Sequence, residues 1–209
     1  MTRYFVDRCE LKTYLRADAF RYVGDYGRMR MLDIVRYYLR HPSYRYVVMM
    51  RLVEYCYGRP WCILLQIYAL VRLHLIRRRT GIQISPKAHI GKGFFIGHYG
   101  SIVINGDVSL GENVNIIQTC TIGVAYRGER GGYPTIESRV YIGAGARIFG
   151  GIKIGDNVAI GANSVVTRDV PDNAVVVGAP AKVISYKGSE GYIYNTIDEQ
   201  GVLHPRFEE

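Results

Sequence analysis

The sequence predicts a parallel β-helix of six-residue repeats that follows an α-helical arm. Two observations lead to this prediction. From residue 84 to residue 166 an aliphatic side chain recurs at six-residue spacing, and such a repeat indicates a coiled array of similar units. Residues 1–80 have a different composition, because they hold 16 of the 27 Lys and Arg residues, 6 of the 18 Asp and Glu residues, and 11 of the 18 Tyr residues.

Residues 1–80 form the predicted α-helical arm. We expect its helices within residues 29–78, separated at Pro42 and Pro60, because proline opens a helix but does not continue one. Two roles fit this basic, Tyr-rich segment. It is a cap that covers the open end of the β-helix and mediates oligomerisation, a peripheral contact with anionic lipid at the inner face of the membrane, or both. No recognised nucleic-acid-binding module accompanies the charge, so we expect no nucleic-acid partner.

The predicted localisation is the cytoplasm. The most apolar stretch, residues 61–76, is shorter than the roughly 20 residues that span a bilayer, so we expect no transmembrane helix. Asp7 and Glu10 precede any apolar run, which argues against a signal peptide. The four cysteines have no CxxC spacing, and reduced thiols are their simplest interpretation.

Residues 81–184 form the predicted β-helix. A period of six fits neither an α-helix nor a hairpin, but it suits a triangular coil in which each unit supplies one short strand and one corner. Three units close a coil, which gives four to five coils. Seven of the periodic residues precede a glycine, which we expect to relieve strain at the corners. The periodic residues are Ile84, Ile90, Ile96, Ile104, Leu110, Ile116, Ile122, Ile136, Ile142, Ile148, Ile154, Ile160 and Val166.

Two segments depart from the repeat. Residues 124–135 (VAYRGERGGYPT) lack the periodic aliphatic residues, so we expect them to leave the β-helix as an external loop. Long loops in a compact fold are often functional. Residues 185–209 follow the last repeats and form the predicted C-terminal tail.

Three stretches carry a family resemblance: LRHPSYRYVVMMRLVEY, TGIQISPKAHIGKGFFIGH, and IGAGARIFGGIKIGDNVAIGANSVVTRDVPDNAVVVGAPAKVI. They resemble hexapeptide-repeat acetyltransferases of the serine acetyltransferase branch, over about residues 30–184. The resemblance implies an all-β left-handed parallel β-helix, acetyl-CoA as donor, and a homotrimer, with a dimer of trimers joined by the arms as a further option. It also implies an active site between neighbouring β-helices.

The resemblance places the general base at His98. A neutral imidazole can take the proton from a hydroxyl as that hydroxyl attacks a thioester. For acetyl-CoA the resemblance implies small residues beside the pantetheine and basic residues at the phosphates. These positions are Ala144, Ala162, Thr167, Arg168 and Lys182. We expect no metal, because a zinc site needs about three convergent ligands and the repeats contain only two histidines.

Departures from the branch guide the predicted acceptor. Gly97 and Gln83 stand where serine acetyltransferases have Asp, and Gly132-Tyr133 stands where they have the Arg-His pair linked to the amino-acid substrate. A buried carboxylate needs a charged partner, so this exchange argues against serine. The stretch from His98 to Asn105 is similar to that of colanic-acid and capsular polysaccharide O-acetyltransferases.

We therefore expect a sugar hydroxyl as acceptor, on a small-molecule or lipid-linked glycan of surface-polysaccharide biosynthesis. In this interpretation Tyr99 and Tyr133 offer a stacking face, Gln83 orients His98, and Asn105 completes the substrate-binding set. Two alternatives stay open. The chain is a serine O-acetyltransferase of cysteine biosynthesis, or it is a scaffold without catalytic activity.

Overall fold

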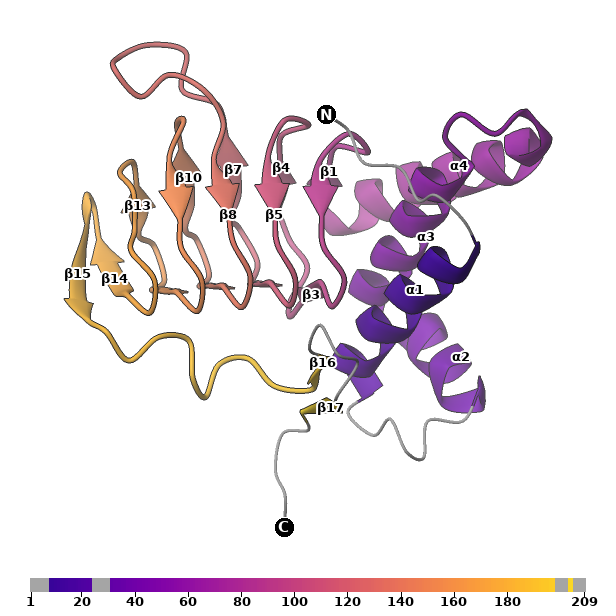
Figure 1. Ribbon diagram of the computed structural model, residues 1–209. Helices are drawn as coiled ribbons and strands as arrows, with labels where there is room; N and C mark the ends of the chain where they lie inside the picture. The colour runs from indigo at the N-terminus through magenta and orange to yellow at the C-terminus, as the bar shows by residue number, and fades with distance from the viewer. Residues whose placement is uncertain (1–7, 24–30, 198–202, 205–209) are drawn as a thin grey trace.

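The computed structural model describes residues 8–23, 31–197 and 203–204. A bundle of helices forms one end of the molecule, and a three-sided β-helix extends from it (Figure 1). A long loop leaves the β-helix on one side, and the C-terminal segment runs back along another side toward the helices (Figure 1).

In its described residues, 8–23 and 31–80, the arm contains four α-helices and a 3₁₀ turn. Proline occupies the first turn of α3, where its missing N–H has no partner to lose, and Gly81 ends α4 in the left-handed conformation. Helix α1 lies before the predicted helical region. Its buried face includes Asp18 and Arg21, so an apolar period does not reveal it. The elements are α1 Arg8–Val23, α2 Met31–Arg40, α3 Pro42–Cys56, the 3₁₀ turn Pro60–Cys62, and α4 Ile63–Thr80.

Short strands form the three sides of the β-helix. Sheet A contains β1, β4, β7, β10 and β13, sheet B contains β2, β5, β8 and β11, and sheet C contains β3, β6, β9, β12, β14 and β15. All pairings are parallel except the β14–β15 hairpin. The strands are β1 Gln83–Ile84, β2 His89–Ile90, β3 Phe95–Ile96, β4 Val103–Ile104, β5 Ser109–Leu110, β6 Asn115–Ile116, β7 Thr121–Gly123, β8 Thr135–Ile136, β9 Tyr141–Ile142, β10 Arg147–Phe149, β11 Lys153–Ile154, β12 Ala159–Ile160, β13 Val165–Val166, β14 Val175–Gly178 and β15 Ala181–Ser185.

The periodic aliphatic residues form the core of the β-helix. Each of the thirteen lies in a strand, and none is more than 6% exposed. They stack in register from coil to coil, as Ile84, Ile104 and Ile122 do in sheet A. The predicted repeat architecture, with parallel strands after a helical region, is therefore correct. The left-handed winding stays a prediction from the resemblance.

The glycines after these residues have a different role from the one we expected. Gly91 and Gly111 have no positive φ. Glycine is needed at these positions because the backbone of the next coil leaves no room for a side chain. A Cβ on Gly91 would be 2.5 Å from the carbonyl oxygen of Gly111. The left-handed corner positions include asparagines, such as Asn113 and Asn157, and other glycines, such as Gly93.

A buried ionic cluster joins the arm to the first coil. Arg51 of α3 is fully buried, and its Nε lies 2.8 Å from the Asp18 carboxylate of α1. Its Nη atoms also donate to Glu54, 3.2 Å away, and to the carbonyl oxygens of Ile90 and Gly91, at 2.7 and 2.6 Å. Arg51 therefore holds two helices and the β-helix together.

The C-terminal segment crosses the outside of sheet C. Tyr192 stacks on Tyr141, with ring centroids 4.6 Å apart, and its carbonyl oxygen accepts a hydrogen bond from Asn115. Arg21 of α1 donates to the carbonyl oxygen of Tyr194 at 2.5 Å and to the Asn115 side chain. The described part of the tail ends in a small hairpin, β16 Thr196–Ile197 and β17 Leu203–His204. The rest of the predicted tail, 198–202 and 205–209, and Asp7 lie outside the described residues.

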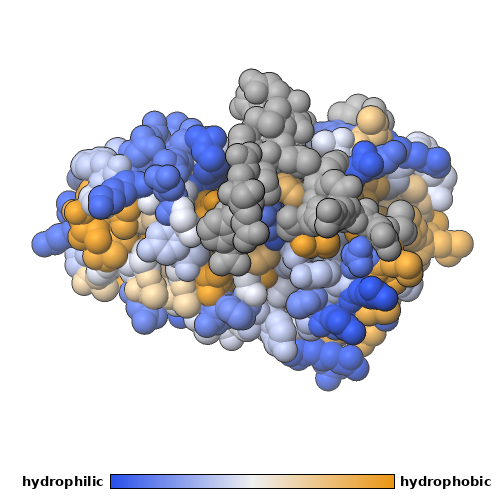
Figure 2. All heavy atoms as spheres, turned by 90° about the horizontal axis from the view of Figure 1, so that it is seen from below, coloured by the Kyte–Doolittle hydropathy of each residue, from blue (hydrophilic) through white to orange (hydrophobic). Residues whose placement is uncertain are grey.

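Apolar surface is exposed at both ends of the molecule. Figure 2 shows it over the β14–β15 hairpin and over the arm. In the arm, Trp61 is 76% and Leu64 is 80% exposed. None of the helices in the described part of the chain is both long and apolar enough to span a bilayer. A peripheral contact with lipid stays a prediction.

Candidate active site

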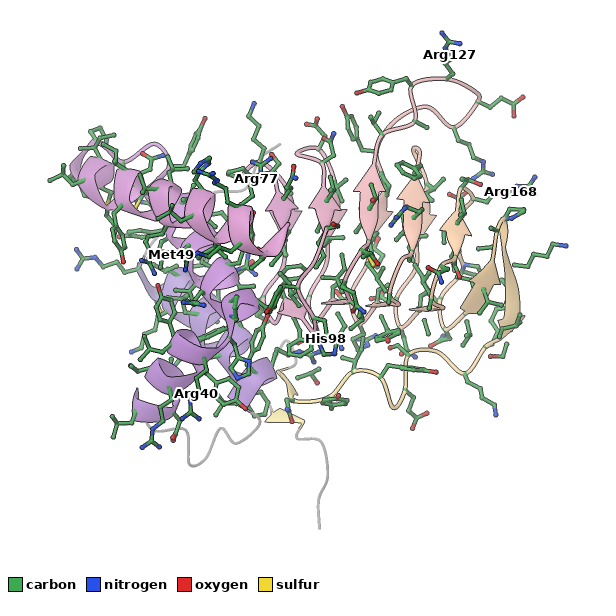
Figure 3. All side chains as sticks on the ribbon, turned by 180° about the vertical axis from the view of Figure 1, so that it is seen from behind. Arg40, Met49, Arg77, His98, Arg127 and Arg168 are labelled. Atoms are coloured by element: carbon green, nitrogen blue, oxygen red, sulfur yellow. The ribbon has the colours of Figure 1, made fainter. Side chains whose placement is uncertain are left out.

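The candidate residues lie on two different edges of the β-helix. At one edge, here called the His98 edge, strands β3, β6, β9 and β12 of sheet C are each followed by a strand of sheet A. At the next, here called the loop edge, sheet A turns into sheet B, and residues 124–134 leave the β-helix there between β7 and β8, whereas Thr135, the last residue of the predicted loop, belongs to β8. Figure 3 shows Arg127 far out on this loop, whereas His98 lies on another side of the β-helix.

His98 projects from an enlarged corner. Between β3 and β4 the corner has six residues, 97–102, whereas the equivalent corner of the next coil has four, 117–120. The extra length is the slip of two residues in the sequence repeat. Gly100 and Ser101 both adopt positive φ there, and His98 is exposed. A backbone that leaves the regular coil therefore presents this imidazole to solvent at the end of the β-helix nearest the arm (Figure 3).

Two of the predicted acetyl-CoA residues share the His98 edge. Ala144 follows β9, and Ala162 follows β12, so both occupy corners equivalent to that of His98 in later coils. Parallel strands lie about 4.8 Å apart, so these alanines are roughly 10 and 14 Å from the His98 corner along the axis. Their methyl side chains add little bulk to this edge of the β-helix.

The other three predicted acetyl-CoA residues gather at the far end. Thr167, Arg168 and Lys182 line one pocket of about 240 Å³, between the last turn of the β-helix and the β14–β15 hairpin. Figure 3 shows Arg168 at the end opposite the arm. Arg168 follows β13 and thus belongs to the loop edge. The loop is tied to the same region, because Arg130 forms a 2.7 Å ion pair with Asp169.

The predicted acceptor-binding residues do not form one group within a single chain. Asn105 and Tyr133 lie on the loop edge, where Asp107 is close to both. Loss of hydration, and then the Asp107 carboxylate, raises the pKa of Tyr133. Gln83 lies on the outer face of sheet A and accepts a 2.7 Å hydrogen bond from Arg77. Its predicted role in orienting His98 stays untested.

Tyr99 follows His98 and borders a pocket that sequence reasoning missed. This pocket has a volume of about 280 Å³ and lies between α3, α4 and the His98 corner. Arg45, Arg72 and Arg79 contribute to its wall. These arginines come from two helices, and no local motif connects them with His98.

A further cavity is unrelated to these edges. It measures about 890 Å³, lies among the arm helices, and is lined by none of the predicted site residues. Within the described ranges, no three His, Cys, Asp or Glu side chains gather as a metal site would require.

Comparisons with known proteins identify the family. The family model described as bacterial transferase hexapeptide (six repeats) matches residues 133–168. A serine acetyltransferase of Synechococcus elongatus is 37% identical over 150 residues, which cover 72% of this chain and 60% of that protein. The soybean serine acetyltransferase structure is 30% identical, with a TM-score of 0.66, and the match covers 83% of this chain and 69% of that one.

A Neisseria gonorrhoeae serine acetyltransferase solved in complex with serine is 29% identical, with a TM-score of 0.67, over 85% of this chain and 70% of that one. The chain spans about 60 to 65% of the length of the curated relatives that it matches.

These relatives contradict the predicted sugar acceptor. The similar proteins are serine acetyltransferases, which was the alternative, and nothing among them supports a polysaccharide or lipid-linked glycan substrate. The prediction relied on the arginine missing at Gly132 and on the similarity of the stretch from His98 to Asn105 to polysaccharide O-acetyltransferases. The chain belongs to the hexapeptide-repeat transferase family, in the branch that contains the serine acetyltransferases.

Proposed function

We propose that this protein is an acetyl-CoA-dependent O-acetyltransferase whose acceptor is L-serine. One observation carries the proposal: His98 occupies an enlarged corner on the same edge as Ala144 and Ala162, in a chain whose relatives are serine acetyltransferases. The chain spans only part of the length of those relatives. Its activity, its substrates and its partners are therefore all parts of this proposal.

In the proposed reaction His98 is the general base. Its neutral imidazole takes the proton from the serine hydroxyl while the oxygen attacks the thioester carbonyl carbon. A carbon–oxygen bond forms, and the tetrahedral intermediate then breaks its carbon–sulfur bond. The departing thiolate of coenzyme A receives the proton from the imidazolium. Transfer is direct, so no acyl-enzyme forms.

The donor is proposed to lie along the His98 edge. Pantetheine follows the small residues Ala144 and Ala162, with its thioester at His98. The adenosine phosphates then lie toward the far end, where Arg168 and Lys182 supply positive charge. No metal takes part in this scheme.

The proposed assembly is a homotrimer in which two chains complete each site. Thr167, Arg168, Asn105 and Tyr133 belong to the loop edge and do not share an edge with His98. A neighbouring copy that presents its loop edge to the His98 edge would bring them together. Repeating this contact around a threefold axis closes a ring. The proposed location is the cytoplasm.

The test is release of free thiol from acetyl-CoA by the full chain. L-serine should stimulate release, and His98→Asn, which keeps a polar side chain of similar length, should reduce kcat by about 10²- to 10⁴-fold. His74→Asn is the matched control, because His74 is an exposed histidine of α4. Equal activity of the two variants would remove His98 from the mechanism. A lack of response to L-serine would contradict the proposed acceptor.

A further inference from the structure

The pocket beside Tyr99 gathers three guanidinium groups. Arg45 comes from α3, Arg72 and Arg79 come from α4, and the pocket is completed by residues that include Thr80 and Tyr99. Among the residues that the structure describes, none with an acidic side chain lines its wall. The pocket is therefore a concentration of positive charge at the junction between the arm and the β-helix.

Unlike those of Arg51 and Arg77, the side chains of the three arginines of this pocket form no hydrogen bond or ion pair with another described residue. The Nε atoms of Arg45 and Arg72 are buried, and neither has a hydrogen-bond partner among the described residues. Within the same ranges, no ion pair or hydrogen bond engages the guanidinium group of Arg79. Arg51, one helical turn and a half beyond Arg45, is by contrast saturated by two carboxylates and two carbonyl oxygens. Buried donors without partners are rare in folded proteins, so an anionic ligand is the natural complement.

The pocket lies beside the corner that carries His98. Tyr99 borders it and is the next residue after His98. The end of α4 is held tightly against this corner, since a Cβ on Gly81 would be 2.7 Å from the backbone nitrogen of Ser101. The residues proposed for the donor extend from His98 in the other direction, toward Arg168 at the far end (Figure 3).

We infer that Arg45, Arg72 and Arg79 form the subsite for the carboxylate of the amino-acid acceptor. This inference rests on the proposed function. In serine only three bonds separate the carboxylate carbon from the hydroxyl oxygen, so an anion held beside Tyr99 leaves the hydroxyl near His98. Guanidinium groups bind carboxylates through paired hydrogen bonds, which also fixes the orientation of the acceptor. The cluster replaces the charge that is missing at Gly132.

The experiment compares L-serine with L-serinamide, which keeps the hydroxyl and the amine but has no carboxylate. For Arg72→Met the KM for L-serine should rise about ten- to hundredfold, which corresponds to the loss of a charge-assisted hydrogen bond. The KM values for L-serinamide and acetyl-CoA should stay unchanged. Arg78→Met is the matched control, because Arg78 is exposed on the same helix and does not line the pocket. Arg79→Met provides a second variant at an exposed side chain, should Arg72→Met fail to fold.

Three results would overturn the inference. A rise in the KM for acetyl-CoA alone would assign the pocket to a donor phosphate. An equal loss with both acceptors would indicate a structural role, and unchanged kinetics would indicate no role.

Calorimetric titration with L-serine separates this inference from the proposed function. If the wild-type protein binds L-serine without acetylating it, and Arg72→Met abolishes this binding, the inferred subsite is supported and the proposed function is wrong. If the wild-type protein neither acetylates nor binds L-serine, both the inferred subsite and the proposed function are wrong.

Discussion

Removing Arg51 is expected to loosen the arm from the β-helix. Arg51→Met keeps much of the length of the side chain but deletes its charge and its hydrogen bonds to Ile90 and Gly91. It also removes the counter-charge of the fully buried Asp18 carboxylate, which still accepts a hydrogen bond from the backbone N–H of Phe94. Desolvation already raises the pKa of Asp18, and loss of Arg51 removes the largest opposing effect.

The expected loss follows from this geometry. Breaking a buried ion pair by deleting one partner destabilises a protein by about 3–5 kcal/mol. A domain is stable by about 5–15 kcal/mol in total, so this is a large fraction. For a chain of this size each kcal/mol lowers Tm by about 2–4 °C, which gives a decrease of roughly 6–20 °C.

The measurement is thermal unfolding followed by circular dichroism at equal protein concentration, since association between copies shifts Tm. Arg36→Met is the control, because Arg36 also pairs with a carboxylate three residues away. That pair is 3.6 Å long, its arginine side chain is 67% exposed, and exposed pairs contribute about 0–1 kcal/mol. If Arg51→Met and Arg36→Met shift Tm equally, the reasoning about the buried cluster is refuted.

Three further predictions concern the cluster, the coils and the donor site. Burial raises the pKa of Glu54 from 4.5 to about 7, so the folded state retains a proton that the unfolded state releases. The contribution of this group to stability therefore falls by about 1.4 kcal/mol per pH unit between these values, and Glu54→Gln should remove that slope in denaturant titrations at several pH values. Gly111→Ala places a Cβ 2.7 Å from the backbone of Glu137 and Ser138, and should lower the free energy of unfolding by about 1–3 kcal/mol, unlike Gly131→Ala, where the added Cβ lies 3.6 Å from its nearest neighbours. Arg168→Met should raise the KM for acetyl-CoA about tenfold and leave that for L-serine unchanged, and the reverse pattern in steady-state kinetics would remove Arg168 from the donor site.

The regular part of the fold was predictable because one physical rule repeats. An inward aliphatic side chain every six residues, as at Ile136 and Ile142, specifies a strand in each case. Helix α1 was not predicted, because its buried face includes the charged residues Asp18 and Arg21. Their hydrogen-bond partners come from α3 and sheet C. Hydrophobic periodicity in a sequence reveals an apolar helix face. It does not reveal a buried helix face whose charged side chains are neutralised by another element.

The candidate site was predictable only in pieces. The slip of two residues in the repeat marks the corner of His98, and the family resemblance gives its role. The separation of His98 from Asn105 onto two edges depends on how the coils stack, which residue spacing alone does not reveal. The arginine pocket could not be predicted from the sequence, because Arg45 and Arg72 come together only when α3 packs on α4.

The most direct test of the proposed activity is identification of its product. The full chain would be incubated with L-serine and acetyl-CoA carrying a ¹³C-labelled acetyl group, and the mixture resolved by liquid chromatography and mass spectrometry. The account predicts labelled O-acetyl-L-serine in amounts that match the free thiol released, and none with His98→Asn. Thiol release without labelled acetylserine, or the same yield from His98→Asn, would contradict it.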